Sequence, residues 1–166
     1  MEGRKPDENI RRPMQWSAEE NAGFTTGNPW RAPDGNFTEI NVASQTNDPN
    51  SLLSHYRALI QLRGKHSALR AGAYHTVKSD SPNVFAALRV DKDEILLVIV
   101  NLSDQTVDDY GLTLQDAVLA DKTYSVETVF GDAQAQGLEA TRGVFENYEP
   151  MTELPPHSTF IVKFQP

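Results

Sequence analysis

The hydrophobic pattern of the chain changes at Ala73. Beyond it, apolar and polar residues alternate with a period of two in short segments rich in β-branched and aromatic residues. Clusters of Asp, Gly, Pro and Ser separate these segments, which are 74–77, 84–90, 94–102, 123–130 and 159–164. Because short strands follow one another with no helices between them, the pattern predicts a mainly β fold, with an antiparallel β-sandwich over residues 71–166.

One predicted strand stands out from the others. Residues 95–100 are apolar at every position, which predicts a central strand covered on both faces. The polar residues 90–94 are expected to form a hairpin connection in front of it. Weaker strands are expected at 106–114 and 151–154, and residues 131–149 are expected to be a long loop or a weak hairpin.

A single amphipathic helix is predicted at about 49–63. Asp48 is the expected N-cap, Pro49 the first helical residue and Gly64 the residue that ends the helix. The apolar positions recur at helical spacing: Leu52, Leu53, Tyr56, Leu59, Ile60 and Leu62. Such a face needs a surface to cover, so we expect it either to pack on the β-domain or to cause self-association.

The first part of the chain lacks a sustained apolar period. Residues 1–10 are expected to be a loose, mobile leader, and residues 11–47 a long, specifically folded loop, because several prolines exclude a continuous helix. Two tryptophans in this loop argue against disorder. Ordered loops of this length in compact domains are usually functional.

Particular motifs in this loop carry a family resemblance. They read Arg-Arg-Pro-Met-Gln-Trp at 11–16, Asn-Ala-Gly-Phe-Thr-Thr-Gly-Asn-Pro-Trp at 21–30 and Glu-Ile-Asn-Val at 39–42. They resemble the α-glucosidase branch of glycoside hydrolase family 13, the α-amylase family, which holds oligo-1,6-glucosidases, dextran glucosidases and trehalose synthases. The resemblance continues to residue 63, and it becomes a looser pattern after Tyr74.

The resemblance implies a C-terminal fragment of such an enzyme. Residues 1–70 would be the end of a (β/α)8 barrel, with the loop after strand eight and the last helix. Residues 71–166 would be the C-terminal β-sandwich, of Greek-key type. The implied partners are the fragment's own catalytic barrel and, in the intact parent, an α-glucoside oligosaccharide. The implied parent reaction is retaining hydrolysis, and glucosyl isomerisation of the trehalose synthase type is the alternative.

The resemblance also implies one substrate-binding residue. Arg11 matches the family's arginine that holds the terminal glucose and pairs with a carboxylate from elsewhere in the barrel. A guanidinium offers a rigid fork of donors for this purpose. The alternative is a surface arginine, and that reading is favoured for the fragment alone. Arg12 occupies the variable position of the motif and receives no role.

Aromatic side chains are the remaining candidates for sugar contacts. Trp16, Phe24 and Trp30 could stack on sugar rings, although wedging the loop against its own scaffold is the favoured reading. Tyr110 and Tyr148 could form an accessory site in the β-domain, again as the less favoured reading. An autonomous carbohydrate-binding module, our second hypothesis, would need an exposed aromatic row on the sandwich, and the strands offer few aromatics for one.

No catalytic residue is assigned. Glycoside hydrolysis needs two carboxylates on either side of the scissile bond, whereas the 23 acidic residues here are scattered over polar positions. The fragment alone is therefore expected to be inactive, and a free-standing enzyme is the third and least favoured hypothesis. Neither the linkage preference, α-1,4 or α-1,6, nor the oligomeric state follows from these residues.

Composition excludes several other classes of function. A net charge of −8 argues against nucleic-acid and anionic-membrane partners. The four histidines show no ligand spacing and cysteine is absent, so we expect no metal, no cofactor and no disulfide. There is neither a signal peptide nor an apolar run of about twenty residues, and a cytoplasmic location is the expectation.

Overall fold

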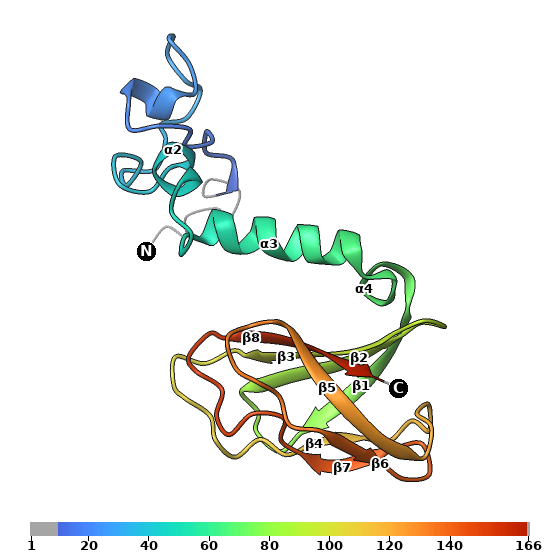
Figure 1. Ribbon diagram of the computed structural model, residues 1–166. Coiled ribbons are helices and arrows are strands. Elements are labelled where there is room, and N and C mark those ends of the chain that lie inside the picture. Colours follow the sequence, from blue (N-terminus) through green and yellow to red (C-terminus); the bar gives the residue numbers. More distant parts are fainter. Residues whose placement is uncertain (1–9, 166) are drawn as a thin grey trace. The chain divides into compact units, whose positions relative to one another are not determined.

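Contacts within the chain divide it after Leu62. The computed structural model describes residues 10–165, and these form two compact units, one ending at Leu62 and the other beginning at Arg63 (Figure 1). The expected mobility of residues 1–10 falls almost entirely outside the described residues. The division into residues 1–70 and 71–166 stays a prediction.

The first unit is mostly loop, as expected. Within residues 11–47 the structure has a short 3-10 element, η1 (Glu20–Gly23), and one short helix, α2 (Val42–Thr46). Asn41 starts α2 through a reciprocal cap: its side-chain oxygen accepts from the Ser44 amide at 2.8 Å, and the Ser44 hydroxyl accepts from the Asn41 amide at 3.3 Å. The loop is therefore ordered largely by its own polar side chains.

The amphipathic helix is present, but both predicted ends were wrong. It is α3, Leu52–Lys65. Ser51 caps it, since the Ser51 hydroxyl accepts from the Ser54 amide at 3.2 Å. Asp48 instead closes the turn in front, where its carboxylate accepts from the Asn50 amide at 2.9 Å. Gly64 continues the helix, and the extended backbone of His66 (φ −109°, ψ 116°) ends it.

The second unit opens with a helix that the sequence pattern did not reveal, α4 (Ser67–Ala71). The strong strands are confirmed within two residues of their predicted ends. The complete set is β1 (Ala73–Ser79), β2 (Val84–Val90), β3 (Ile95–Asn101), β4 (Leu112–Leu114), β5 (Lys122–Phe130), β6 (Leu138–Ala140), β7 (Phe145–Tyr148) and β8 (Thr159–Gln165).

The weaker strand predictions were only partly correct. Of residues 106–114, only the last three join the sheet, as β4. Of residues 151–154, only Leu154 is bridged, and its partner is Val107. Residues 131–149, expected to be a long loop or a weak hairpin, contain the short strands β6 and β7, and an antiparallel bridge between Thr141 and Val144 lies between them.

All the strands pair antiparallel, in the order β6-β5-β8-β3-β2-β1-β4-β7. The first three strands form a meander, and β4 returns to lie beside β1, which is a Greek-key arrangement. Figure 1 shows the sheet folded into two layers, with β8, β3 and β2 in one and β4, β7 and β6 in the other. The mainly β, sandwich-type fold is confirmed.

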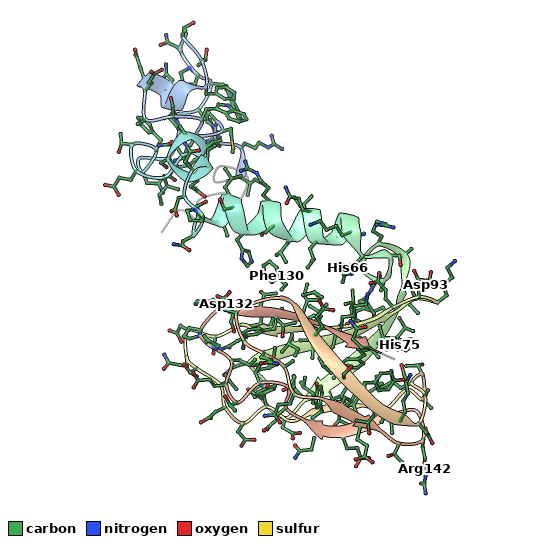
Figure 2. The ribbon with its side chains drawn as sticks, viewed as in Figure 1. His66, His75, Asp93, Phe130, Asp132 and Arg142 are labelled. Carbon is green, nitrogen blue, oxygen red and sulfur yellow. The ribbon has the colours of Figure 1, made fainter. Side chains whose placement is uncertain are left out.

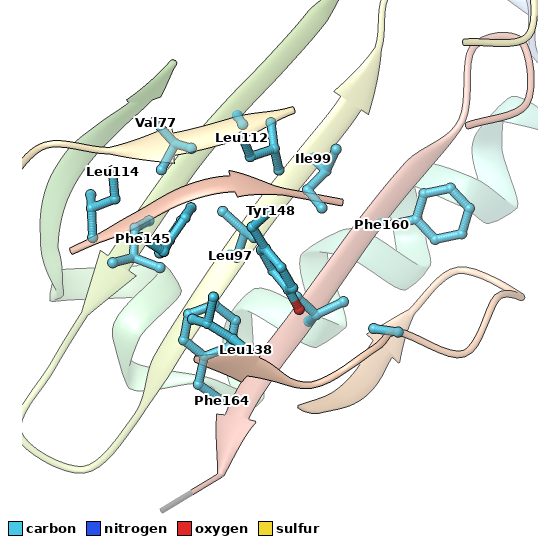
Figure 3. Close-up of a cluster of buried hydrophobic side chains, with 14 of the residues drawn as sticks. Val77, Leu97, Ile99, Leu112, Leu114, Leu138, Phe145, Tyr148, Phe160 and Phe164 are labelled. Carbon is cyan, nitrogen blue, oxygen red and sulfur yellow. The ribbon is translucent and has the colours of Figure 1, made fainter. Parts of the chain in front are cut away.

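The predicted central strand is central. β3 lies between β2 and β8. Leu97 and Ile99 face the core between the layers, and Leu96 is fully buried on the opposite face, where α4 lies near β2 and β3. Figure 3 shows the core side chains, among them Phe145, Tyr148 and Phe164. These three rings and that of Tyr124 form a cluster with centroids 5.6–6.5 Å apart.

Candidate functional site

Arg11 and the three candidate aromatic residues of the loop fall in the first unit. Arg11 is exposed in the irregular segment that leads to Trp16. The rings of Trp16 and Phe24 are about half exposed, at 50% and 51%, and Trp30 is 76% exposed. The structure therefore leaves all three aromatic side chains accessible within this chain.

A left-handed turn connects two of these aromatic residues. Asn21, Ala22 and Gly23 have φ values of 53°, 58° and 65°. The amides of Trp16 and Ser17 both donate to the Ala22 carbonyl, at 2.9 and 3.1 Å, so these two residues are tied to the turn. Phe24 follows directly, and its amide donates to the Asn21 carbonyl at 3.1 Å.

This turn carries backbone strain. A left-handed conformation costs a non-glycine residue about 1–2 kcal/mol, and Ala22 adopts it while fully buried. The Asn21 side chain compensates in part, because its amide group donates to the carbonyls of Thr25 at 3.3 Å and Gly27 at 3.1 Å. Strained turns that the surroundings hold in place are common at ligand-binding and active sites.

Arg12 has a partner that the sequence did not reveal. Its guanidinium donates to the Asp34 carboxylate at 2.8 Å. The pair lines a hollow of about 450 Å³, together with the exposed apolar side chains of Ile10, Met14 and Ile40. Arg11 does not line this hollow.

Trp30 also has a cation beside it. The guanidinium carbon of Arg31 lies 4.8 Å from the centre of the Trp30 ring, within the range of a cation–π contact. The contact fixes the position of the ring on one side.

Tyr110 and Tyr148 cannot form an accessory sugar site, because their rings belong to the core. The Tyr110 hydroxyl donates to the Met151 carbonyl at 2.6 Å and accepts from the Met151 amide at 3.0 Å. The Tyr148 hydroxyl donates to the Gln136 carbonyl at 2.6 Å. Burial raises the pKa of Tyr110 to about 12, and burial also raises the pKa of Tyr148. Both phenols are thus neutral hydrogen-bond donors that hold loops in place.

A polar cluster in the second unit surrounds Glu94. Its carboxylate lies 2.8 Å from His66 Nδ1 and accepts from the Ser67 hydroxyl and the Ala68 amide, each at 3.1 Å. Lys163 Nζ is 3.8 Å away. Burial raises the pKa of Glu94, but the hydrogen bonds from His66, Ala68 and Ser67 outweigh it and hold that pKa at about 2.

No signal in the sequence pointed to this cluster, since 28 residues separate His66 from Glu94. A general acid in glycoside hydrolysis needs a raised pKa, so Glu94 is unsuited to that task. Within residues 10–165, no group of three His, Asp or Glu side chains is placed to hold a metal ion. In the same part of the chain, no helix is long and apolar enough to cross a membrane.

Known proteins resemble this chain over most of its length. Residues 1–72 match the family model described as alpha amylase, catalytic domain. Trehalose-6-phosphate hydrolase of Bacillus subtilis strain 168 is 38% identical over 81% of this chain and 24% of its own length. Oligo-1,6-glucosidase of Parageobacillus thermoglucosidasius is 43% identical over 61% of this chain and 18% of its own length.

Solved structures agree with these sequence relatives. Trehalulose synthase from Pseudomonas mesoacidophila MX-45 matches with a TM-score of 0.70 at 32% identity, over 95% of this chain and 26% of that one. An isomaltulose synthase mutant from Erwinia rhapontici NX5, solved with D-glucose, matches with a TM-score of 0.68 at 30% identity, over 96% of this chain and 26% of that one.

The chain thus spans about a quarter or less of the length of the relatives it matches. Its catalytic-domain match stops at residue 72, just before β1, and the sandwich follows. By its motifs, its fold and these relatives, the chain belongs to the α-amylase family, glycoside hydrolase family 13, and corresponds to the C-terminal part of a protein of its α-glucosidase branch.

Proposed function

We propose that this chain is the non-catalytic C-terminal part of an α-glucoside-acting glycoside hydrolase, in which the β-sandwich stabilises the catalytic barrel. The observation that carries the proposal is the uneven distribution of exposed apolar side chains. Of the twelve large hydrophobic residues that are exposed in residues 10–165, nine belong to the first unit: Ile10, Met14, Trp16, Phe24, Trp30, Ile40, Leu52, Tyr56 and Ile60.

These side chains need a partner. Leaving apolar area in water costs about 25 cal/mol per Å², and patches of this kind mark interaction surfaces. The first unit lies wholly within the match to a catalytic domain, and that match covers only part of the relatives' length. The rest of a catalytic barrel is therefore the partner that we propose for this surface. In the isolated chain, self-association through α3 would take its place.

In the complete protein, we assign Arg11 to the terminal glucose and to a carboxylate from elsewhere in the barrel. Its position in the Arg-x-Pro-Met-Gln-Trp motif supports this role, as does its exposure. Trp16 and Phe24, on either side of that turn, would wedge it against the barrel. Stacking of Trp16, Phe24 or Trp30 on sugar stays the less favoured role.

The proposed reaction of the complete protein is retaining hydrolysis of a terminal α-glucosidic bond. The names of two relatives, trehalose-6-phosphate hydrolase and oligo-1,6-glucosidase, support hydrolysis. The solved relatives are named trehalulose synthase and isomaltulose synthase, and they favour glucosyl isomerisation as the second candidate. A free-standing carbohydrate-binding module is the less favoured candidate: Tyr110 and Tyr148 are buried, and Tyr74 and Phe85 are the exposed aromatic residues that the described part of the sandwich offers it.

Complementation tests the proposal. The preceding part of the complete protein, co-expressed with this chain, should cleave an α-glucoside that neither part cleaves alone. Arg11→Ala should abolish that activity and leave the two parts bound to each other, whereas Arg12→Ala, which removes the neighbouring guanidinium, should retain most of it. Full activity of the preceding part alone would overturn the stabilising role, and retained activity in Arg11→Ala would overturn the assignment of Arg11.

A further inference from the structure

The boundary of the catalytic-domain match and the boundary of the structural units do not coincide. The match runs to residue 72, whereas the second unit begins at Arg63. Residues 63–72 therefore belong to the catalytic domain by sequence and to the β-unit by contacts. They contain the end of α3 and all of α4.

Short helices such as α4 are unstable unless their ends are satisfied. α4 has five residues, and its own N-cap residue, His66, contributes no side-chain capping bond. The cap comes from another part of the chain. The Glu94 carboxylate accepts from the Ala68 amide in the first turn, at 3.1 Å, and the negative charge also suits the helix N-terminus.

The contacts of Glu94 join three elements. Besides Ala68, it holds His66 Nδ1 at 2.8 Å and the Ser67 hydroxyl at 3.1 Å, and Lys163 of β8 approaches within 3.8 Å. Its side chain is only 8% exposed. From β2, Arg89 donates through Nε to the Ala68 carbonyl at 3.1 Å, so the same turn of α4 is bound from a second side.

The turn between β2 and β3 is well placed for this role. Asp91, Lys92 and Asp93 of the turn precede Glu94, and Lys92 lies 3.6 Å from Asp93 with both side chains largely exposed. Figure 2 shows His66 and Asp93 at the same end of the second unit, near α4. Among the acidic residues of this turn, the Glu94 side chain is 8% exposed and that of Asp93 is 71% exposed. Asp91 adds a hydrogen bond to Ser67 at the helix start.

We propose that Glu94 is a clamp that fixes residues 66–72, the last stretch of the catalytic-domain match, on the sheet, and that this junction opens as one local unit when the clamp is removed. The Greek-key core does not depend on it, since the core side chains lie on the other face of β2 and β3. The clamp is thus a specific tie between the end of the catalytic-domain segment and the β-unit, and it does not depend on the proposed reaction.

Amide hydrogen exchange in the full chain, followed by NMR, tests the clamp. In Glu94→Ala, the amides of Ala68 and of Gly72, which donates to the Ala68 carbonyl at 3.0 Å, should exchange at least about tenfold faster. The amides of β2, β3 and β8 should keep their protection. Asp93→Ala is the matched control, because it removes an exposed acid from the same turn, and it should change none of these rates.

Two outcomes would overturn the clamp. One is unchanged exchange at Ala68 and Gly72, and the other is an equal loss of protection throughout the sheet, which would make Glu94 part of the global fold. Should Glu94→Ala fail to fold, Ser67→Ala removes one of the three hydrogen bonds. It should accelerate the same two amides by a smaller factor, and no change there would also contradict the clamp.

Discussion

At the scale of single residues, Gly23 occupies a demanding position of the first unit. It has a φ of +65°, and a Cβ added there would lie 2.4 Å from the Ser17 hydroxyl. We expect Gly23→Ala to destabilise the first unit by about 1–2 kcal/mol. The readout is tryptophan fluorescence during urea unfolding, because both tryptophans, Trp16 and Trp30, lie in this unit.

Gly35 provides the control for this substitution. No atom lies within 4 Å of the position a Cβ would take at Gly35. Gly35→Ala should therefore change the unfolding midpoint little. Equal effects of the two substitutions would mean that the left-handed turn does not limit the stability of this unit.

Because of Glu94, the unfolding free energy of the second unit should depend on pH in the acidic range. In the folded chain the pKa of Glu94 is about 2, against 4.5 for an unperturbed glutamate carboxyl. A depressed pKa stabilises the folded state above pH 4.5, and this contribution falls as pH drops toward 2. The titratable and charged groups that face it are His66, Lys163, Asp91 and, through Ala68, Arg89.

The shift corresponds to at most about 3 kcal/mol. In Glu94→Gln, which cannot ionise, the difference in unfolding free energy between pH 6 and pH 2.5 should be smaller than in the parent chain by up to that amount. Urea unfolding followed by near-UV circular dichroism of the tyrosines measures it. Parallel pH profiles for the two proteins would contradict the role of the Glu94 charge.

A substitution at Tyr110 tests how much its buried hydroxyl stabilises the fold. Tyr110→Phe keeps the ring but leaves the amide and the carbonyl of Met151 without their partner, which should cost about 1–3 kcal/mol. Tyr74→Phe, at a position that is 52% exposed, should change the unfolding free energy by less than about 0.5 kcal/mol. A loss as small at Tyr110 would show that water replaces the bond.

At the scale of elements, the sequence pattern and the structure assign Gly64 different places in α3. The sequence pattern placed a helix end there, whereas the structure continues the helix to Lys65. If the helix continues, Gly64→Ala should stabilise it by about 1 kcal/mol, since the new Cβ meets no atom within 4 Å. Ala58→Gly, at an exposed position in the same helix, should destabilise it by a similar amount. Amide exchange in α3 measures both, and destabilisation by Gly64→Ala would restore the helix end at Gly64.

The exposed stripe of α3 makes a prediction about association. Leu52, Tyr56 and Ile60 lie one turn apart on one face and are 59–69% exposed. If the isolated chain self-associates through this face, Tyr56→Glu should weaken the association at least about tenfold, because it places a charge in an apolar contact. Gln61→Glu adds the same charge elsewhere on the helix and is the control. Sedimentation equilibrium of both variants measures the self-association. Equal weakening by the two substitutions would show that the chains do not associate through this face of α3.

The same elements show what could be predicted from the sequence. Strands β2 and β3 were predictable because their apolar residues alternate or run continuously between clear turn signals. The start of α3 was missed because Asp48-Pro49 satisfies the rules for a helix cap, while Ser51 satisfies them equally well three residues later. The strands β6 and β7 are three and four residues long and too short for a period to emerge.

The candidate site was less predictable than the fold. Motifs placed Arg11 and the three aromatic residues in one loop, and the structure adds the turn at Ala22 that orders this loop. The Arg12–Asp34 pair and the Glu94 cluster join residues 22 and 26–28 positions apart. Pairs so distant leave no periodic trace, so only folding reveals them.

At the scale of the whole molecule, we propose that this chain does not catalyse by itself and that activity arises only together with the rest of a catalytic barrel. The most direct measurement is incubation of the purified chain with isomaltose and with maltotriose, following the sugar signals by NMR in the same tube as the protein amides. We expect both sugars to stay intact and the amides of the sandwich not to shift. Cleavage of either sugar would contradict this proposal, and saturable shifts in the sandwich without cleavage would establish the carbohydrate-binding module in its place.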